Sequence, residues 1–88
     1  MEIQKLIGAR IKEIRKELDE TQEAMAYKAE IDKTYWNEVE NGKRNVSVQN
    51  LGKIVHSLDH CIADFFDHHT FKNLPNGKKT GGKRSKRK

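Results

Sequence analysis

Residues 22–45 constrain the fold of this chain more than any other stretch, because their apolar side chains follow two short helical patterns. The apolar positions are Met25, Ala26, Ala29, Ile31, Trp36 and Val39. Two amphipathic helices that cross at a steep angle bury such side chains in one small shared core. The stretch therefore predicts two short helices, joined by a tight turn at residues 29–31 and followed by a basic loop.

The second of these helices carries a polar face opposite to Trp36 and Val39. On a helical wheel this face displays Thr34, Asn37, Glu38 and Asn41, with Lys33 and Tyr35 at its flanks. Apart from Glu38, these side chains donate hydrogen bonds, or donate and accept them, as contact with base edges in the DNA major groove requires. We therefore predict that the helix over residues 33–41 enters the major groove as a recognition helix.

Apolar periodicity outside this stretch predicts three further helices, so the fold class is all-α. The first helix, over residues 3–18, has one apolar stripe, formed by Ile3, Ile7, Ile11, Ile14 and Leu18. Gly8 weakens this helix by roughly 1 kcal/mol relative to alanine. The fourth helix has an apolar face of Leu51, Ile54, Val55 and Leu58. A short fifth helix spans about residues 61–67, and the periodicity is lost beyond it.

Capping residues indicate where the helices begin and end. Thr21, Asp32 and Ser47 each precede a helical pattern, in the N-cap position that such side chains favour. Asn41 and Gly42 form a stop signal at the end of the recognition helix.

Length and composition limit the chain to one small domain. With 88 residues, 34% of them hydrophobic, a single core is marginal unless it is all-helical or supported by dimerisation. No apolar run of about 18 residues exists and the N-terminus lacks the apolar block of a signal peptide, so we expect a cytoplasmic protein without a membrane partner. The single cysteine, Cys61, excludes an intramolecular disulfide and a cysteine-rich zinc site.

The formal net charge of +5 is divided unevenly along the chain. Residues 1–71, the expected domain, hold ten of the 18 basic residues and all 13 acidic ones, whereas residues 72–88 hold eight basic residues and no acid. We expect residues 72–88 to be a disordered, flexible basic tail, which serves either as a non-specific DNA arm or to increase solubility. Attraction of the domain to DNA must therefore be local, through Lys33, Lys43 and Arg44.

With these helices placed, the chain resembles the helix-turn-helix domain of the phage repressor and Cro family, also called the XRE family. The resemblance covers about residues 7–66 and depends on Gln22, Ala26, Ile31, residues 39–43 and residues 48–66. Residues 32–35 and 44–45 are most similar to those of small restriction-modification controller proteins. The resemblance implies a five-helix, lambda-repressor-like domain with its motif at residues 22–41. It also implies a transcriptional regulator, such as a repressor, that binds an inverted-repeat operator as a symmetric homodimer.

The chain departs from this family at the turn of the motif. Relatives usually have glycine where this chain has Glu30, because a positive φ is often needed there, and another residue costs on the order of 1 kcal/mol. Asp19 and Asp59 likewise stand where relatives often have Gly or Asn.

We expect eight residues to contact double-stranded DNA: Gln22, Lys33, Thr34, Tyr35, Asn37, Lys43, Arg44 and Asn45. Lys33 suits guanine or phosphate, Thr34 the methyl group of thymine, and Asn37 adenine, each good pair being worth roughly 1–3 kcal/mol of discrimination. The resemblance implies a DNA contact by Gln22 at its helix N-terminus, and Tyr35 suits the phosphate backbone. The three residues of the basic loop should hold phosphate after the recognition helix.

Two further sets of residues have expected structural roles. The resemblance implies that Arg15 and Glu40 form an ion pair that holds the recognition helix on the first helix. Ile62, Phe65 and Phe66 are the candidate dimer interface, because apolar surface beyond a small core needs covering.

We expect neither an enzyme nor a bound cofactor or metal, because the chain has no paired carboxylates, activated nucleophile or phosphate-binding glycine loop. His56, His60, Cys61, His68 and His69 do not follow a known zinc-binding spacing. The alternative hypothesis is a protein-interaction module, such as an antitoxin with secondary DNA binding. Sequence-selective retention of DNA would distinguish the regulator from this alternative.

Overall fold

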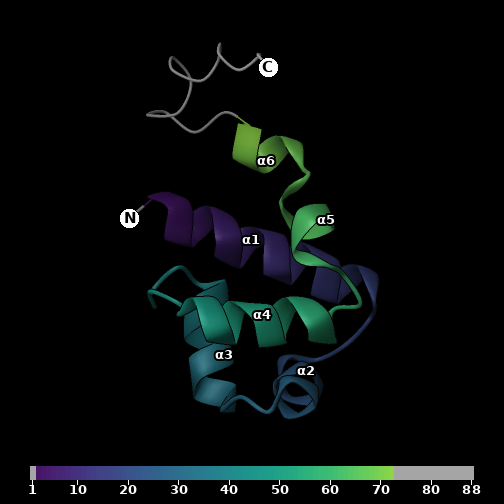
Figure 1. Ribbon diagram of the computed structural model, residues 1–88. Helices are drawn as coiled ribbons and strands as arrows, with labels where there is room; N and C mark the ends of the chain where they lie inside the picture. Colours follow the sequence, from purple (N-terminus) through teal and green to yellow (C-terminus); the bar gives the residue numbers. More distant parts are fainter. Residues whose placement is uncertain (1, 73–88) are drawn as a thin grey trace.

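The computed structural model describes residues 2–72, which form six α-helices and, within that range, no strand. The helices are α1 (Glu2–Glu17), α2 (Gln22–Ala29), α3 (Lys33–Glu40), α4 (Val48–Ser57), α5 (Ile62–Phe66) and α6 (His69–Lys72) (Figure 1). The predicted all-α class is confirmed, and α6 adds one helix to the five expected. The expected basic tail lies outside the described residues, apart from Lys72.

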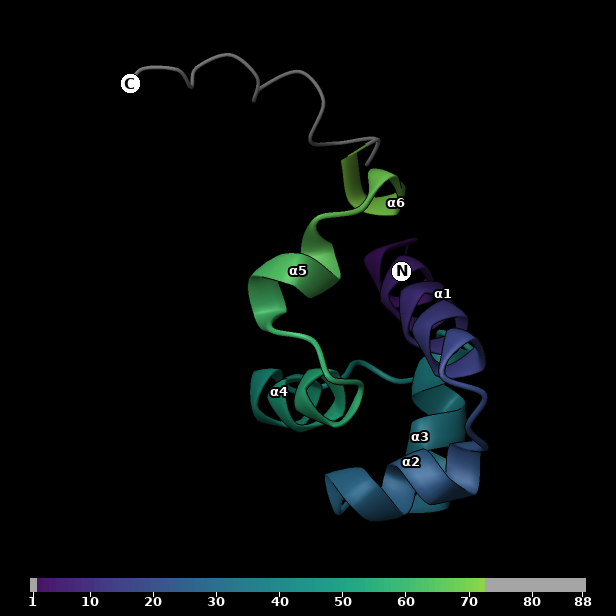
Figure 2. The same ribbon diagram turned by 90° about the vertical axis from the view of Figure 1, so that its right-hand side faces the viewer.

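The six helices pack around one apolar core. α1 packs against α3 and α6, α2 packs against α3 and α4, and α5 packs against α4. In both views α2 and α3 lie at one end of the molecule and α6 at the other (Figure 1, Figure 2). The core side chains are Ile11, Ile14, Met25, Ala26, Ala29, Trp36, Val39, Ile54, Val55, Leu58 and Phe65. The core therefore includes most of the predicted apolar stripes.

Side-chain caps begin the three helices for which the sequence predicts them. The Thr21 hydroxyl accepts a hydrogen bond from the Ala24 N–H at 3.0 Å, and Asp32 accepts one from the Thr34 N–H at 2.9 Å. Ser47 accepts one from the Asn50 N–H at 3.1 Å. These bonds satisfy amide groups that a helix N-terminus leaves without a partner inside the helix.

The four longest helices end in the same way, with one residue in the left-handed conformation. Asp19, Glu30, Gly42 and Asp59 have φ values of 58°, 60°, 72° and 62°. After α2, the Glu30 N–H donates to Tyr27 O and the Ile31 N–H donates to Ala26 O, which is a Schellman motif. The motif turn thus keeps the positive φ that favours glycine, although its residue is glutamate.

α1 and α3 approach each other so closely that only glycine fits at position 8. A Cβ atom on Gly8 would lie 2.3 Å from the carbonyl oxygen of Val39 and 2.6 Å from that of Glu40. Both atoms belong to the backbone of α3, so they cannot rotate away as a flexible side chain would. Gly8 therefore has a packing role in addition to its expected cost to helix propensity.

Phe65 lies inside the protomer, which corrects its assignment to the dimer interface. Its side chain is fully buried, and its carbonyl accepts a hydrogen bond from Arg10 Nε at 3.0 Å. The core requires a large side chain where α5 meets α4, and a five-residue helix is too short to show which of its apolar residues turns inward. Ile62 remains 48% exposed, and Phe66 is partly buried.

The short helix α6 had no periodic signal in the sequence, because it has only four residues. Its Phe71 packs against the core, with its ring centroid 4.8 Å from that of Phe66. No helix among residues 2–72 combines the length and the apolar character needed to cross a membrane.

Candidate nucleic-acid interface

α3 presents a polar face to the outside while its opposite face is buried. Trp36 and Val39 are in the core, whereas Lys33, Thr34 and Asn37 are exposed. The inward face positions the helix, since Trp36 fills the core between α3 and its neighbours. The three exposed side chains are the ones predicted to contact base edges.

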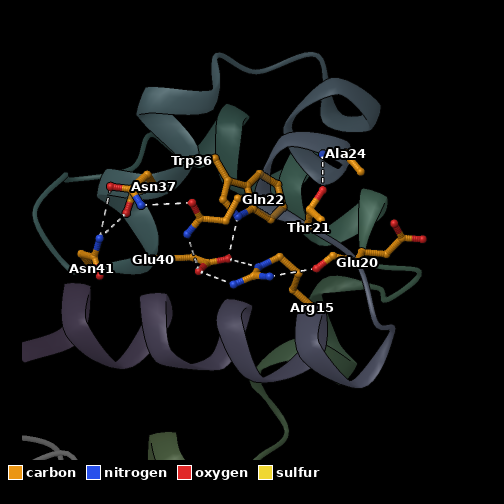
Figure 3. Close-up of polar contacts among 9 residues, drawn as sticks. All are labelled: Arg15, Glu20, Thr21, Gln22, Ala24, Trp36, Asn37, Glu40 and Asn41. Atoms are coloured by element: carbon orange, nitrogen blue, oxygen red, sulfur yellow. Dashed lines mark hydrogen bonds and ion pairs between the residues drawn. The ribbon is translucent and has the colours of Figure 1, made fainter.

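A buried ion pair connects α3 to α1. Arg15 Nε lies 2.6 Å from Glu40 Oε2, and Arg15 Nη2 lies 3.0 Å from Glu40 Oε1 (Figure 3). The indole N–H of Trp36 also donates to Glu40 Oε2, at 2.7 Å. Arg15 Nη1 donates to the carbonyl of Glu20, at 2.8 Å. The structure thus brings together Arg15 and Glu40, the two residues expected to pair.

The charge of Glu40 is stabilised by these donors. Burial by itself raises the pKa of Glu40, but hydrogen bonds from Arg15, Gln22 and Trp36, with the positive charge of Arg15, outweigh it. The pKa of Glu40 therefore lies below its ordinary value, and the carboxylate is ionised at neutral pH.

A chain of amide groups runs from this ion pair to the exposed face of α3. Gln22 Nε2 donates to Glu40 Oε1 at 2.9 Å, and Gln22 Oε1 accepts from Asn37 Nδ2 at 3.0 Å (Figure 3). Asn41 Nδ2 then donates to Asn37 Oδ1 at 3.2 Å and to the Asn37 carbonyl at 3.0 Å. We call Gln22, Asn37 and Asn41 the amide chain. Each of these residues has a predictable place on its own helix, but no local sequence pattern indicates that α2 and α3 bring them together.

The basic loop after α3 is held against α3 by Arg44. Arg44 Nη2 and Nε lie 2.6 Å and 3.1 Å from Glu38 Oε1, and the guanidinium carbon lies 4.8 Å from the centroid of the Tyr35 ring. The Tyr35 hydroxyl accepts a bond of 3.4 Å from the Ser47 N–H. Lys43 and Asn45 are exposed beside Arg44. Glu38, the one side chain of the polar face that does not donate hydrogen bonds, thus pairs with a residue predicted to bind phosphate.

The histidines near the C-terminal end of the described residues do not assemble a metal site. Among residues 2–72, no three His, Cys, Asp or Glu side chains lie together as metal ligands would. His68 and His69 stack with ring centroids 4.3 Å apart, and His68 Nε2 lies 3.4 Å from Glu13 Oε1. These contacts place His68 between α6 and α1.

Comparison with protein families matches residues 8–60 to a helix-turn-helix domain. The chain is 43% identical to the control protein C.MunI of Mycoplasma sp over 60 residues, which cover 67% of this chain and 81% of the relative.

Two solved structures have a similar fold. One is the restriction-modification controller protein C.AhdI from Aeromonas hydrophila, with a TM-score of 0.72 and 32% identity over 75% of this chain and 100% of that chain. The other is the controller protein C.Esp1396I, a tetramer in complex with its natural 35 base-pair operator. It has a TM-score of 0.69 and 35% identity over 72% of this chain and 83% of that chain. The residues matched to the helix-turn-helix domain, 8–60, contain both α2 and α3.

Proposed function

The chain belongs to the helix-turn-helix domain family that includes the restriction-modification control proteins, and from this premise we propose that it is a sequence-specific DNA-binding transcriptional regulator. It binds an inverted-repeat operator as a homodimer, with α3 in the major groove. It is a binding protein and not an enzyme, and it acts in the cytoplasm, where it meets DNA.

The observation that carries this proposal is the exposed face of α3. Lys33, Thr34 and Asn37 are exposed on a helix that the buried Arg15–Glu40 pair holds on the scaffold. Exposed donors and acceptors on a rigid helix meet the two requirements of base contact, chemistry and position. The exposed Lys43 and Asn45 lie next to this helix, where they suit contact with the phosphate backbone.

A second copy of the chain is the proposed partner at α5. Ile62 is a large apolar side chain that is 48% exposed, and Phe66 beside it is only partly buried. A twofold partner would cover them and place the second α3 about one DNA turn, roughly 34 Å, from the first. The tetrameric operator complex of C.Esp1396I supports association of such chains on DNA.

Selection from a pool of random DNA duplexes tests DNA recognition directly. We expect the wild-type protein to enrich an inverted repeat and to retain it in a gel shift at two salt concentrations. Lys33→Ala should weaken binding to the selected duplex by roughly 1–3 kcal/mol if Lys33 contacts a base. Lys12→Ala removes the same charge from an exposed position on α1, outside the residues expected to contact DNA, and serves as the matched control. Equal retention of all duplexes would instead favour the protein-interaction module.

Sedimentation tests the homodimer. Ile62→Asp should shift the protein toward monomer, because the new charge would be buried between the two copies. Val48→Asp makes the same kind of change at an apolar side chain that is 88% exposed on α4, so it should leave the dimer intact. A wild-type protein that is monomeric at micromolar concentration, alone and on the selected duplex, would contradict the proposed dimer.

A further inference from the structure

We infer that Gln22 is a positioning residue for base recognition. It fixes the orientation of the Asn37 amide, and therefore which side of the amide presents the NH2 donor and which presents the oxygen acceptor to the DNA. The inference rests on the proposed function, since it concerns how α3 distinguishes one base pair from another. It assigns Gln22 a role beyond its expected contact with DNA. The partner it implies is a base that offers both an acceptor and a donor, such as adenine in the major groove.

The orientation of the amide chain is set at its buried end. Glu40 is ionised, so its oxygens only accept hydrogen bonds. The Gln22 amide must therefore turn its NH2 group toward Glu40 Oε1, as the 2.9 Å contact shows. The opposite orientation would place the Gln22 oxygen against a carboxylate oxygen. The buried charge thus decides which end of the Gln22 side chain points outward.

The orientation of the Gln22 amide in turn determines the orientation of the Asn37 amide. The outward atom of Gln22 is an acceptor, Oε1, and it lies 3.0 Å from Asn37 Nδ2. A flipped Asn37 amide would bring two acceptors together at this point. It would also lose the bond at the other end of the amide, where Asn41 Nδ2 donates to Asn37 Oδ1 at 3.2 Å. Both neighbours therefore favour the same orientation of Asn37.

Asn37 keeps enough capacity to contact DNA in this orientation. An amide NH2 group has two N–H donors and an amide oxygen has two lone pairs, and the amide chain uses one of each. The remaining donor and acceptor are on an exposed residue. They form the pair that a bidentate contact with adenine N7 and N6 requires. Because the Asn37 donor and acceptor are held in a fixed order, they match adenine better than a base with a different order of donor and acceptor.

Gln22→Met is the main test, because methionine has a similar length but neither donates nor accepts as an amide does. Four proteins are compared by selection from the same pool of random duplexes: wild type, Asn37→Ala, Gln22→Met and the double variant. Asn37→Ala identifies the base pair that Asn37 contacts by abolishing a preference there of about tenfold. Gln22→Met should reduce the preference at that same pair to about twofold or less, and the double variant should show no additional loss.

Gln4→Met provides the matched control. It makes the same substitution on α1, outside the amide chain, and should leave the base preferences unchanged. If Gln22→Met does not fold, as judged by its thermal unfolding, Gln22→Ala takes its place. A second measurement follows the side-chain NH2 group of Asn37 by NMR in the free protein. We expect it to be ordered in the wild type and mobile after Gln22→Met.

The outcomes separate this inference from the proposed function. A wild-type protein that selects no sequence would overturn both. A wild-type preference that Gln22→Met leaves unchanged, or lowers equally at every position, would overturn the positioning role alone. An Asn37 NH2 group that is equally mobile with and without Gln22 would do the same.

Discussion

Two glutamates of α3 lie two residues apart and have different partners, because the helix turns one inward and the other outward. Glu40 is buried and receives hydrogen bonds from Arg15, Gln22 and Trp36. Glu38 is only partly buried and pairs with the exposed Arg44. At the scale of single residues, the Glu40 carboxylate stabilises the fold, whereas the Glu38 carboxylate affects the charge of the surface proposed to face DNA.

The buried carboxylate predicts a pH-dependent contribution to folding. Because the pKa of Glu40 is lowered in the folded state, its stabilisation is complete above the ordinary glutamate pKa of about 4.3. It is lost as the pH falls from there through the lowered folded-state pKa. Glu40→Gln should cost on the order of 3 kcal/mol at neutral pH, because it leaves Arg15 buried without its counter-charge.

Urea unfolding of the wild type and Glu40→Gln at a series of pH values checks this prediction. The difference in unfolding free energy should shrink as the pH drops below about 4. Glu17→Gln, which removes an exposed carboxylate from α1, controls for the change in net charge. A difference for Glu40→Gln that stays constant down to the acid limit of folding would contradict the assignment.

The exposed pair predicts an effect on DNA binding. Arg44 is bonded to Glu38 through two nitrogen atoms, so its charge is partly occupied. Glu38→Gln should free Arg44 to neutralise one more phosphate and should remove a negative charge beside the DNA. We expect tighter binding at low salt and a salt dependence whose slope is steeper by about one.

Affinity for the selected duplex, measured over a series of salt concentrations, gives this slope. Glu17→Gln makes the same change of charge on α1 and should leave the slope near the wild-type value. If both variants change the slope equally, the effect is one of net charge and not of Arg44.

At the scale of secondary-structure elements, the first four helices end in the same backbone conformation, although the residues that adopt it differ. α1 to α4 are each followed by a residue with positive φ, and only Gly42 among these residues lacks a Cβ atom. Hydrogen bonds across each helix end hold the left-handed conformation in place. The strain at the other three positions is therefore compensated by the fold around them.

Glu30→Gly should relieve this strain in the turn between α2 and α3. We expect the free energy of unfolding to rise by about 1 kcal/mol, because glycine adopts φ near 60° without steric cost. Chemical denaturation measures the change. Glu20→Gly alters a nearby loop residue that lacks positive φ, so it should give no gain. A Glu30→Gly variant no more stable than the wild type would mean that the glutamate side chain makes a compensating interaction.

At the scale of the whole molecule, the position of α3 depends on its approach to α1. Gly8 allows this approach, and the Arg15–Glu40 pair bonds the same two helices one to two turns further along α1. The helix that presents Thr34 and Asn37 is thus held by two contacts with α1. These contacts fix where α3 sits on the domain, whereas the polar side chains of its outer face follow from the sequence.

Gly8→Ala should separate α1 from α3 and lower the unfolding free energy by about 1–3 kcal/mol, because the added Cβ would meet backbone atoms. Gly52→Ala in α4 is the matched control, since no atom lies within 4 Å of its added Cβ. It should raise stability by about 0.8 kcal/mol through helix propensity alone. Thermal unfolding of the two variants should therefore shift in opposite directions, and a shared direction would contradict the close approach.

The sequence by itself determined the helices and which face of α3 is exposed. Apolar periodicity and capping residues act over three or four positions, so they are visible in a linear chain. For this reason α1 to α5, the caps at Thr21, Asp32 and Ser47, and the exposure of Thr34 and Asn37 were predictable.

Only the tertiary structure decided how distant residues meet. The contacts of Gly8 with α3, of Gln22 with Asn37 and of Phe65 with Arg10 join positions that no local pattern connects. The short α6 depends on packing of Phe71 and not on periodicity. Packing joins residues by their separation in space, whereas a sequence pattern reports only their separation along the chain. The amide chain exists only because folding places Gln22 of α2 beside Asn37 of α3 (Figure 3).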